Sequence, residues 1–144
     1  MSAFRTLSET MLASPQIGPE DIAAAKEAGV TLIVNNRPDQ EDPGAPQGDE
    51  IAAAASAAGI DYRAIPIGHS GFSEVHVAAM IEALEGADGK VLAYCRSGTR
   101  STFLWALAQA KSGAASPEEI AAAARDAGYD VSAIRPMIDM LAAR

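Results

Sequence analysis

The sequence predicts an α/β fold in which a mainly parallel central sheet is flanked by helices on both faces. Short apolar runs rich in β-branched residues alternate with longer alanine-rich segments along the 144 residues. Glycine ends several of the alanine-rich segments, as expected of a helix C-terminus. Strands separated by helices are joined by crossovers, which favour parallel pairing. The length fits one domain covering residues 1–144.

The first half of the chain alternates between the two kinds of segment. A proline followed by acidic residues suits the first turn of a helix, and a β-branched run suits a buried strand. The expected elements are one or two short strands within residues 4–17, a helix from Gly18 to Gly29, a strand at 30–34, a loop at 35–48 rich in Pro, Gly and acids, a helix at 49–58 ending at Gly59, and a strand at 62–67.

The second half contains one further strand and is otherwise helical. Ser116 and Glu119 form a capping box, which marks the start of a helix. The expected elements are a break at 68–71, a helix at 73–85, a strand at 90–94, a helix at 102–111, a helix from Ser116 to about Gly128, and a last helix at 131–143 in which Pro136 is a kink or an internal boundary.

The strand at 90–94 leads directly into the segment Cys95-Arg96-Ser97-Gly98-Thr99-Arg100-Ser101, which holds the only cysteine of the chain. Backbone N–H groups of such a loop, and the positive end of the helix that follows, favour negative charge. Arg100 adds a cation. We therefore expect an activated thiolate at the carboxyl edge of the sheet, where α/β folds bind ligands. The loops at 35–48 and 68–71 also follow strands and should surround it.

Composition narrows the possible partners and the compartment. The net charge of −8 argues against nucleic acid and against an anionic membrane as partners. A single cysteine cannot form an internal disulfide and fits a reducing compartment. No signal-peptide pattern and no apolar stretch of ~20 residues is found, so we expect a soluble, cytoplasmic protein. No cofactor is expected, and a metal site of Cys95, His69 and His76 has no familiar ligand spacing.

The cysteine segment resembles the active-site loop of rhodanese-type sulfurtransferases. The order of elements resembles instead the cysteine-dependent, dual-specificity-phosphatase-like fold, because three helices and no strand follow the loop. More narrowly, the chain resembles the beta-lactamase-hydrolase-like, phosphatase-like family, small bacterial proteins often labelled sulfur transferases. The resemblance covers nearly the whole chain and is carried by residues 33–41, 62–66, 92–101 and 104–107.

The number of residues between the cysteine and the arginine distinguishes two activities that the resemblance implies, sulfur transfer and phosphoester hydrolysis. The phosphatase signature has a cysteine, five residues and an arginine, which requires arginine at position 101. Ser101 stands there, and Arg100 comes one residue early. The histidine that precedes the phosphatase cysteine is replaced by Tyr94, and residues 65–71 contain no carboxylate to act as a general acid.

We therefore expect a sulfurtransferase in a phosphatase-like fold. Cys95 attacks a small anionic sulfur donor and forms a persulfide, and an acceptor thiol then takes the sulfur. Arg100 is the expected catalytic cation. The expected substrate-binding residues are Arg96, Ser97, Gly98, Thr99, Ser101 and His69. The alternatives are a small phosphatase that uses Cys95 on a phosphoester, and a non-catalytic module that senses an anion or a thiol.

Several residues have a plain structural alternative. His69 can be an ordinary loop residue, Arg96 can point to solvent, and Trp105 is expected in the core. Arg37, Asp39 and Glu41 form either a salt-bridge cluster at the rim or, as we favour, a solvated loop. The family resemblance also implies a metallo-hydrolase active on persulfides as a functional partner.

Overall fold

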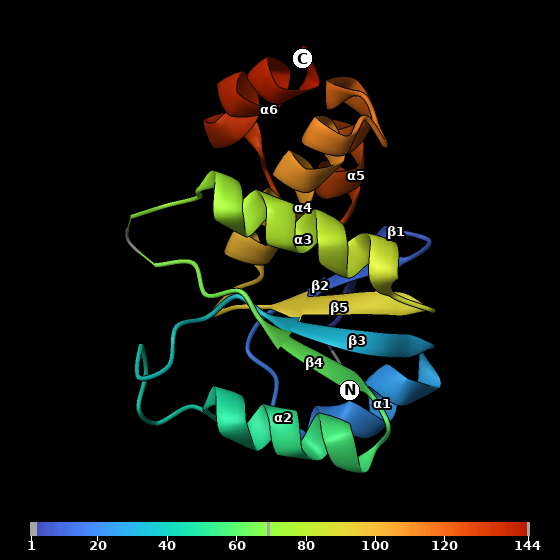
Figure 1. The fold of residues 1–144 in the computed structure, drawn as a ribbon, viewed down its shortest axis with the longest axis vertical. Helices are drawn as coiled ribbons and strands as arrows, with labels where there is room; N and C mark the ends of the chain where they lie inside the picture. Colours follow the sequence, from blue (N-terminus) through green and yellow to red (C-terminus); the bar gives the residue numbers. More distant parts are fainter. Residues whose placement is uncertain (1–2, 69, 144) are drawn as a thin grey trace.

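The central layer is a five-stranded sheet with the strand order β1-β2-β5-β3-β4 (Figure 1). The computed structural model describes residues 3–68 and 70–143. β1 pairs antiparallel with β2, and every other neighbouring pair is parallel, which confirms the predicted sheet type. The strands are β1 (Arg5–Ser8), β2 (Met11–Ser14), β3 (Val30–Asn35), β4 (Asp61–Ala64) and β5 (Lys90–Tyr94).

Helices cover both faces of the sheet, as predicted (Figure 1). On one face lie α1 (Ile22–Glu27) and α2 (Gly48–Ala57). On the other lie α3 (Glu74–Gly86), α4 (Thr99–Ser112), α5 (Pro117–Asp126) and α6 (Arg135–Ala142). Among the helices of the described chain, none is long and apolar enough to cross a membrane.

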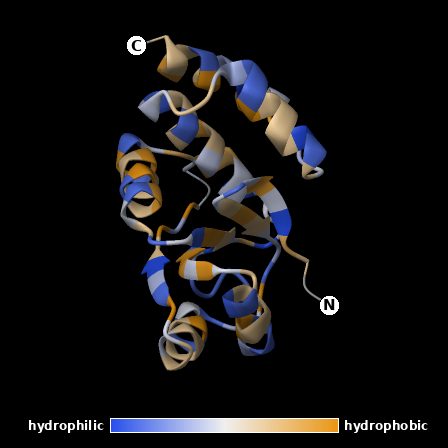
Figure 2. Ribbon diagram, turned by 90° about the vertical axis from the view of Figure 1, so that its right-hand side faces the viewer, coloured by the Kyte–Doolittle hydropathy of each residue, from blue (hydrophilic) through white to orange (hydrophobic). Residues whose placement is uncertain are grey.

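The sheet separates two hydrophobic cores, because side chains alternate between the faces of a strand. Along β5, Val91 and Ala93 belong to the core under α3–α6, whereas Leu92 and Tyr94 belong to the core under α1 and α2. Trp105 is 3% exposed in the larger core, as predicted. Figure 2 shows hydrophobic residues along the strands in the middle of the molecule.

A boundary difference that affects the cysteine segment lies at α4, which begins at Thr99 and not at residue 102. Gly98 is the N-cap, so Arg100 belongs to the first helical turn. β4 ends at Ala64, although the amide N–H groups of Ile65 and Ile67 still donate to the backbone of Asn35 and Asn36.

The first and the last predicted helix also begin differently from the prediction. The helix expected from residue 18 starts as a 3-10 turn at Pro19–Asp21 before α1. The last helix is preceded by a 3-10 turn at Ser132–Ile134, and Pro136 lies in the first turn of α6. Pro136 therefore marks a boundary and not a kink, because proline tolerates the first helical turn.

Candidate functional site

Cys95 directly follows the central strand of the sheet. Its backbone N–H donates to Ser14 O of β2 at 3.3 Å, which continues the ladder one residue past Tyr94. The side chain is buried, with the residue 0% exposed. The amide of Gly98 donates to Cys95 Sγ at 3.1 Å. The loop therefore curls back so that a backbone donor faces the sulfur, as the sequence predicted.

Gly98 makes this tight curl possible. Its φ of +93° lies in the left-handed region, which glycine adopts without steric cost. A Cβ added at this position would overlap the hydroxyl of Tyr129 and lie 2.9 Å from Tyr129 Cζ. Both the backbone angle and the space therefore require glycine here.

Unpaired backbone donors line the turn between Cys95 and α4. The amide of Thr99 donates to Ser97 Oγ at 3.4 Å, and the amide of Thr102 donates to Gly98 O at 2.9 Å. For the part of the chain that the structure describes, no acceptor is recorded for the amides of Arg96, Ser97, Arg100 and Ser101. Clustered N–H groups at a helix N-terminus form a site for an anion.

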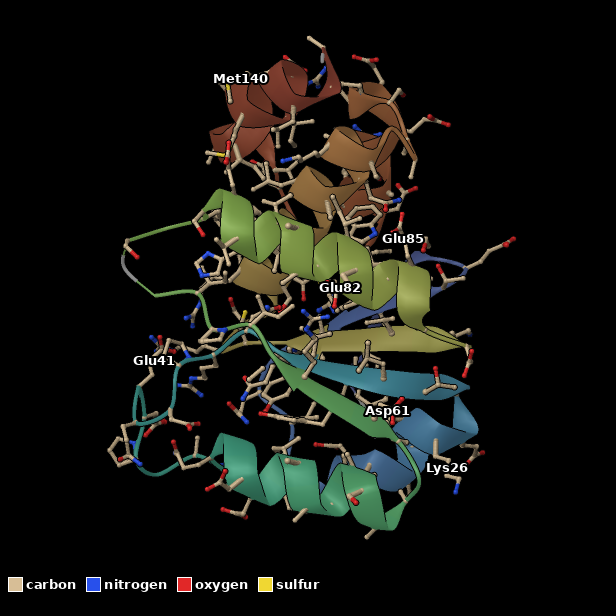
Figure 3. All side chains as sticks on the ribbon, in the orientation of Figure 1. Lys26, Glu41, Asp61, Glu82, Glu85 and Met140 are labelled. Atoms are coloured by element: carbon tan, nitrogen blue, oxygen red, sulfur yellow. The ribbon has the colours of Figure 1, made fainter. Side chains whose placement is uncertain are left out.

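Arg100 is held at this turn by a carboxylate from a distant loop. Its Nη1 donates to Glu41 Oε2 at 2.8 Å and to Ile67 O at 2.9 Å, and its Nη2 donates to Glu41 Oε1 at 2.7 Å. Glu41 Oε1 also accepts a hydrogen bond from Arg37 Nε at 2.8 Å. Figure 3 shows Glu41 on the loop beyond the carboxyl ends of the strands.

These contacts leave part of the Arg100 guanidinium available. A guanidinium carries five N–H groups, and two adjacent ones can bind two oxygens of one anion. Glu41 and Ile67 O accept three of the five. One N–H of Nη2 and the N–H of Nε have no acceptor recorded within the described residues, so Arg100 is oriented and still able to bind an anion.

The charges of this cluster reinforce one another. Hydrogen bonding from Arg100, supported by that from Arg37 and opposed by burial, lowers the pKa of Glu41 from 4.5 to about 2. The hydrogen bond to Glu41 raises the pKa of Arg100, and the neighbouring Cys95 raises it further, while burial acts against both. Glu41 is therefore ionised at neutral pH and is a poor proton donor.

A pocket of about 300 Å³ opens above these side chains. It is lined by Glu41, Gly68, Arg96 and Arg100. Two of its four lining residues are cationic, in a chain whose net charge is −8. An anion is therefore attracted locally although the whole protein repels it.

A buried hydrogen bond ties α4 to the loop after β3. Ser101 Oγ donates to Asn36 Oδ1 at 2.8 Å, and Asn36 Nδ2 donates to Ile65 O at 2.9 Å. Both Ser101 and Asn36 are 0% exposed. The Ser101 hydroxyl is thus engaged by Asn36, and the backbone N–H of Ser101 has no acceptor recorded among the described residues.

The structure gathers most of the predicted site residues. Cys95, Gly98 and Arg100 lie together, and Arg96 is exposed at the pocket. Ser97 Oγ and Thr99 Oγ1 are hydrogen-bonded to each other at 3.0 Å. The substrate-binding roles given to these residues stay predictions, and His69 lies outside the described residues.

The favoured interpretation of the loop after β3 is wrong. Arg37 and Glu41 form an ion pair at 2.8 Å instead of merely solvating the loop. Asp39 does not join them, because its Oδ1 accepts the amide of Gly48 at 3.0 Å. The spacing of Arg37 and Glu41 at i and i+4 was the available signal, but their link to Arg100 spans 59 residues.

Sequence reasoning also missed Asn36 and Tyr129. Tyr129 Oη donates to Ser97 O at 3.2 Å, although 32 residues separate the two. Burial raises the pKa of Tyr129, Arg5 opposes this effect, and Cys95 adds to it. Tyr94, which replaces the phosphatase histidine, turns its ring into the core under α1 and α2, and burial raises its pKa.

Two further properties of the site follow from the described residues. No group of three or more His, Cys, Asp or Glu side chains among them could hold a metal ion. His76 lies three residues into the start of α3, where its Nδ1 accepts the amide of Ser73 at 3.1 Å. His76 is thus part of the helix cap at the start of α3.

Comparison with known families agrees with this geometry. Residues 3–112 match the model of the phosphatase-like domain of beta-lactamase hydrolase-like proteins. The chain belongs to this family. The Beta-lactamase hydrolase-like protein of Agrobacterium fabrum is 33% identical over 124 residues, which are 86% of this chain and 28% of that protein. The chain therefore spans less than a third of that relative's length.

Solved structures confirm the fold. A proposed phosphatase of Neisseria meningitidis is 29% identical, covers 98% of this chain and 99% of its own, and has a TM-score of 0.85. Tk-PTP in its active form covers 99% of this chain and 97% of its own with a TM-score of 0.72. Its identity of 18% shows the fold alone. The predicted cysteine-dependent phosphatase fold is thus confirmed.

The comparisons bear unequally on the two chemistries. They place the chain in a phosphatase-like enzyme family, which supports the phosphatase-type alternative better than the sulfurtransferase. They contain no support for sulfur transfer itself. The choice between the two therefore depends on the chemistry of the site.

Proposed function

We propose that this chain is a sulfurtransferase that passes a sulfane sulfur through a persulfide on Cys95. The observation that carries the proposal is that Glu41 is ionised and hydrogen-bonded, and so is a poor proton donor. It is the carboxylate that lines the pocket, and it is bound to two arginines with a pKa lowered to about 2. Residues 65–71 contain no Asp or Glu. A leaving group that needs no proton suits such a site.

Sulfur transfer has this property. The Cys95 thiolate attacks the outer sulfur of thiosulfate, a new S–S bond forms, and the old S–S bond breaks. Sulfite leaves with the electron pair of that bond and needs no protonation. An acceptor thiolate then attacks the outer sulfur of the persulfide and regenerates the Cys95 thiolate, so no net oxidant or reductant is required.

The pocket suits the donor. Arg100 has two N–H groups without a recorded partner among the described residues, and the amides of Arg100 and Ser101 at the start of α4 likewise have no acceptor recorded there. These donors can hold the sulfonate oxygens while the outer sulfur faces Cys95. We further propose that the acceptor is a small thiol, whose persulfide product a metallo-hydrolase partner consumes, as the family resemblance implies.

A phosphatase-type hydrolase is the second candidate. The fold and the Neisseria relative favour it. The same thiolate would attack phosphorus, and an alkoxide would leave. An alkoxide departs slowly without a general acid. An aryl phosphate is therefore the substrate class for which this candidate is most credible, because a phenolate leaves more easily.

The two candidates are separated by one set of measurements. Mass spectrometry of the protein after thiosulfate treatment should show a gain of about 32 Da, one sulfur atom, on Cys95. The adduct should vanish on addition of glutathione and be absent from Cys95→Ser. Turnover of an aryl phosphate that depends on Cys95, without any sulfur adduct, would establish the phosphatase instead. No turnover on either substrate would leave the anion-sensing module.

A further inference from the structure

We propose that Tyr129 is a positioning residue that acts on Cys95 through the peptide group between Ser97 and Gly98. The two ends of this one peptide group make two separate hydrogen bonds. At the carbonyl end, Ser97 O accepts from Tyr129 Oη at 3.2 Å. At the amide end, Gly98 N donates to Cys95 Sγ at 3.1 Å. The tyrosine hydroxyl and the sulfur are thus joined by a single rigid unit.

The planarity of the peptide transmits the effect. In a trans peptide the C=O and N–H bonds point in opposite directions, so fixing the carbonyl also fixes the direction of the N–H. A donor at the carbonyl oxygen withdraws electron density and makes the N–H a stronger donor in turn. Tyr129 therefore aims and strengthens the hydrogen bond that Cys95 Sγ accepts.

The packing at Gly98 shows that this arrangement is tight. A Cβ at Gly98 would overlap the Tyr129 hydroxyl, and it would also lie 3.3 Å from the carbonyl carbon of Ser14. Gly98 is therefore enclosed between Ser14 of β2 and the side chain of Tyr129. Without the hydroxyl, this peptide would lose the one partner that the structure records for its carbonyl.

Tyr129 is itself held from two sides. Its amide donates to Ala124 O at 2.8 Å, and Gly128 takes a φ of +96° to end α5. Arg5 Nη1, on β1, donates to Ala127 O at 3.1 Å. Tyr129 and the end of α5 lie beyond the 3–112 stretch that matches the family model, whereas Arg5 lies within it.

Few charged groups act on Cys95 Sγ besides the hydrogen bond that Tyr129 strengthens. Arg100 on α4 interacts with Cys95, and Glu41 is hydrogen-bonded to Arg100. Tyr129 faces Cys95 from the C-terminal segment, with Arg5 behind. The raised pKa of Tyr129 keeps its hydroxyl protonated as a donor throughout the neutral range.

The inference rests on the proposed use of Cys95 as a thiolate nucleophile, but its test needs no sulfur transfer. The rate of Cys95 alkylation by iodoacetamide is measured between pH 5 and pH 10 for the wild type and for Tyr129→Phe. The pH of half-maximal rate should rise by roughly 0.3 to 1 unit in Tyr129→Phe. With thiosulfate, kcat should fall about three- to tenfold while KM changes less than twofold.

Tyr62→Phe is the matched control. Tyr62 is half-buried and its hydroxyl also takes part in one recorded hydrogen bond, with Asn35 Nδ2 at 3.0 Å. It lies on β4 and packs against the core under α1 and α2, whereas Tyr129 packs against the core under α3–α6, so the removal of its hydroxyl should leave the alkylation profile unchanged. A 3-fluorotyrosine placed at position 129 gives a second test, because its more acidic hydroxyl should move the midpoint downward.

Each outcome either supports or refutes the proposed role of Tyr129. An unchanged alkylation midpoint in Tyr129→Phe overturns the proposal, even if the Tm falls, because the hydroxyl would then serve stability alone. A shift equal to that of Tyr62→Phe overturns it as well. A shift in Tyr129→Phe with no sulfur adduct on the wild type would sustain this inference and refute the sulfurtransferase.

Discussion

Arg100 and Glu41 form a two-pronged ion pair, Nη1 to Oε2 at 2.8 Å and Nη2 to Oε1 at 2.7 Å. The same carboxylate binds Arg37. Glu41 thus fixes the direction of the Arg100 guanidinium without using all of its N–H groups. The pair joins the loop after β3 to the first turn of α4 and sets the geometry of the pocket beside Cys95.

Glu41→Gln should lower kcat/KM for thiosulfate about tenfold. A glutamine offers only one acceptor oxygen, and its amide N–H groups face the guanidinium donors, so Arg100 loses its fixed direction. Steady-state kinetics measure the effect. Glu82→Gln removes an exposed ion pair with Arg63 and should leave the kinetics unchanged. An increase in kcat/KM for Glu41→Gln would mean that Glu41 blocks the anion site instead of orienting Arg100.

The same carboxylate should make stability depend on pH in the acid range. The pKa of Glu41 in the folded protein, about 2, lies below its ordinary value of 4.5. Its contribution is therefore complete above about pH 4.5 and is lost as the pH falls toward 2. With solvent screening, we expect about 1 kcal/mol to be lost. The difference in unfolding free energy between wild type and Glu41→Gln, from urea titrations at pH 7, 5, 4 and 3, should shrink accordingly. A difference in unfolding free energy that stays constant with pH would contradict this prediction.

Gly98→Ala should impair the site much more than Gly113→Ala. Both glycines flank α4 with positive φ, +93° and +75°. A Cβ at Gly113 meets nothing within 4 Å, whereas one at Gly98 collides with Tyr129. Backbone strain alone should cost about 1 kcal/mol at each position. Thermal unfolding should therefore show an extra loss in Gly98→Ala, together with at least a tenfold lower alkylation rate at Cys95. Equal losses in both variants would show that the Tyr129 contact is unimportant.

Ser101→Ala should destabilise the fold by about 1 to 3 kcal/mol, because Asn36 Oδ1 would be left buried without its donor. Ser112→Ala is the matched control on the same helix, since its hydroxyl makes an exposed bond to Gln109 O at 3.4 Å. That variant should stay within about 0.5 kcal/mol of wild type. Urea denaturation measures both. Similar values for the two variants would mean that the Ser101–Asn36 bond contributes little.

Much of the fold was accessible to sequence patterns because those patterns are local. The β-branched run that begins at Val30 and the apolar run before Cys95 correspond to β3 and β5. The capping box at Ser116 does open α5. The predicted helix and strand boundaries were wrong where a residue outside the local pattern determines them. Gly98 starts α4 three residues early because its left-handed backbone lets the helix begin directly at the turn.

The site was predictable only along the continuous cysteine segment. Cys95 and Arg100 are close in sequence, so their proximity follows from one turn. Glu41 and Tyr129 reach that turn from 59 and 32 residues away, to Arg100 and Ser97 respectively. Nothing in the residues around Tyr129 indicates which carbonyl its hydroxyl will meet. Such contacts depend on the assembled sheet and on how the C-terminal helices pack over it.

The complete burial of Cys95 has a consequence for oxidative damage. Burial limits the access of oxidants to the sulfur, and a sulfenic acid formed on a cysteine is normally resolved by a second thiol. This chain contains no other cysteine to act as a resolving partner. A thiol from outside this chain would then be needed to reduce it, and that thiol must gain access to a side chain that is 0% exposed. The recovery of an oxidised Cys95 therefore depends on thiols supplied from outside this chain and on an opening of its buried site.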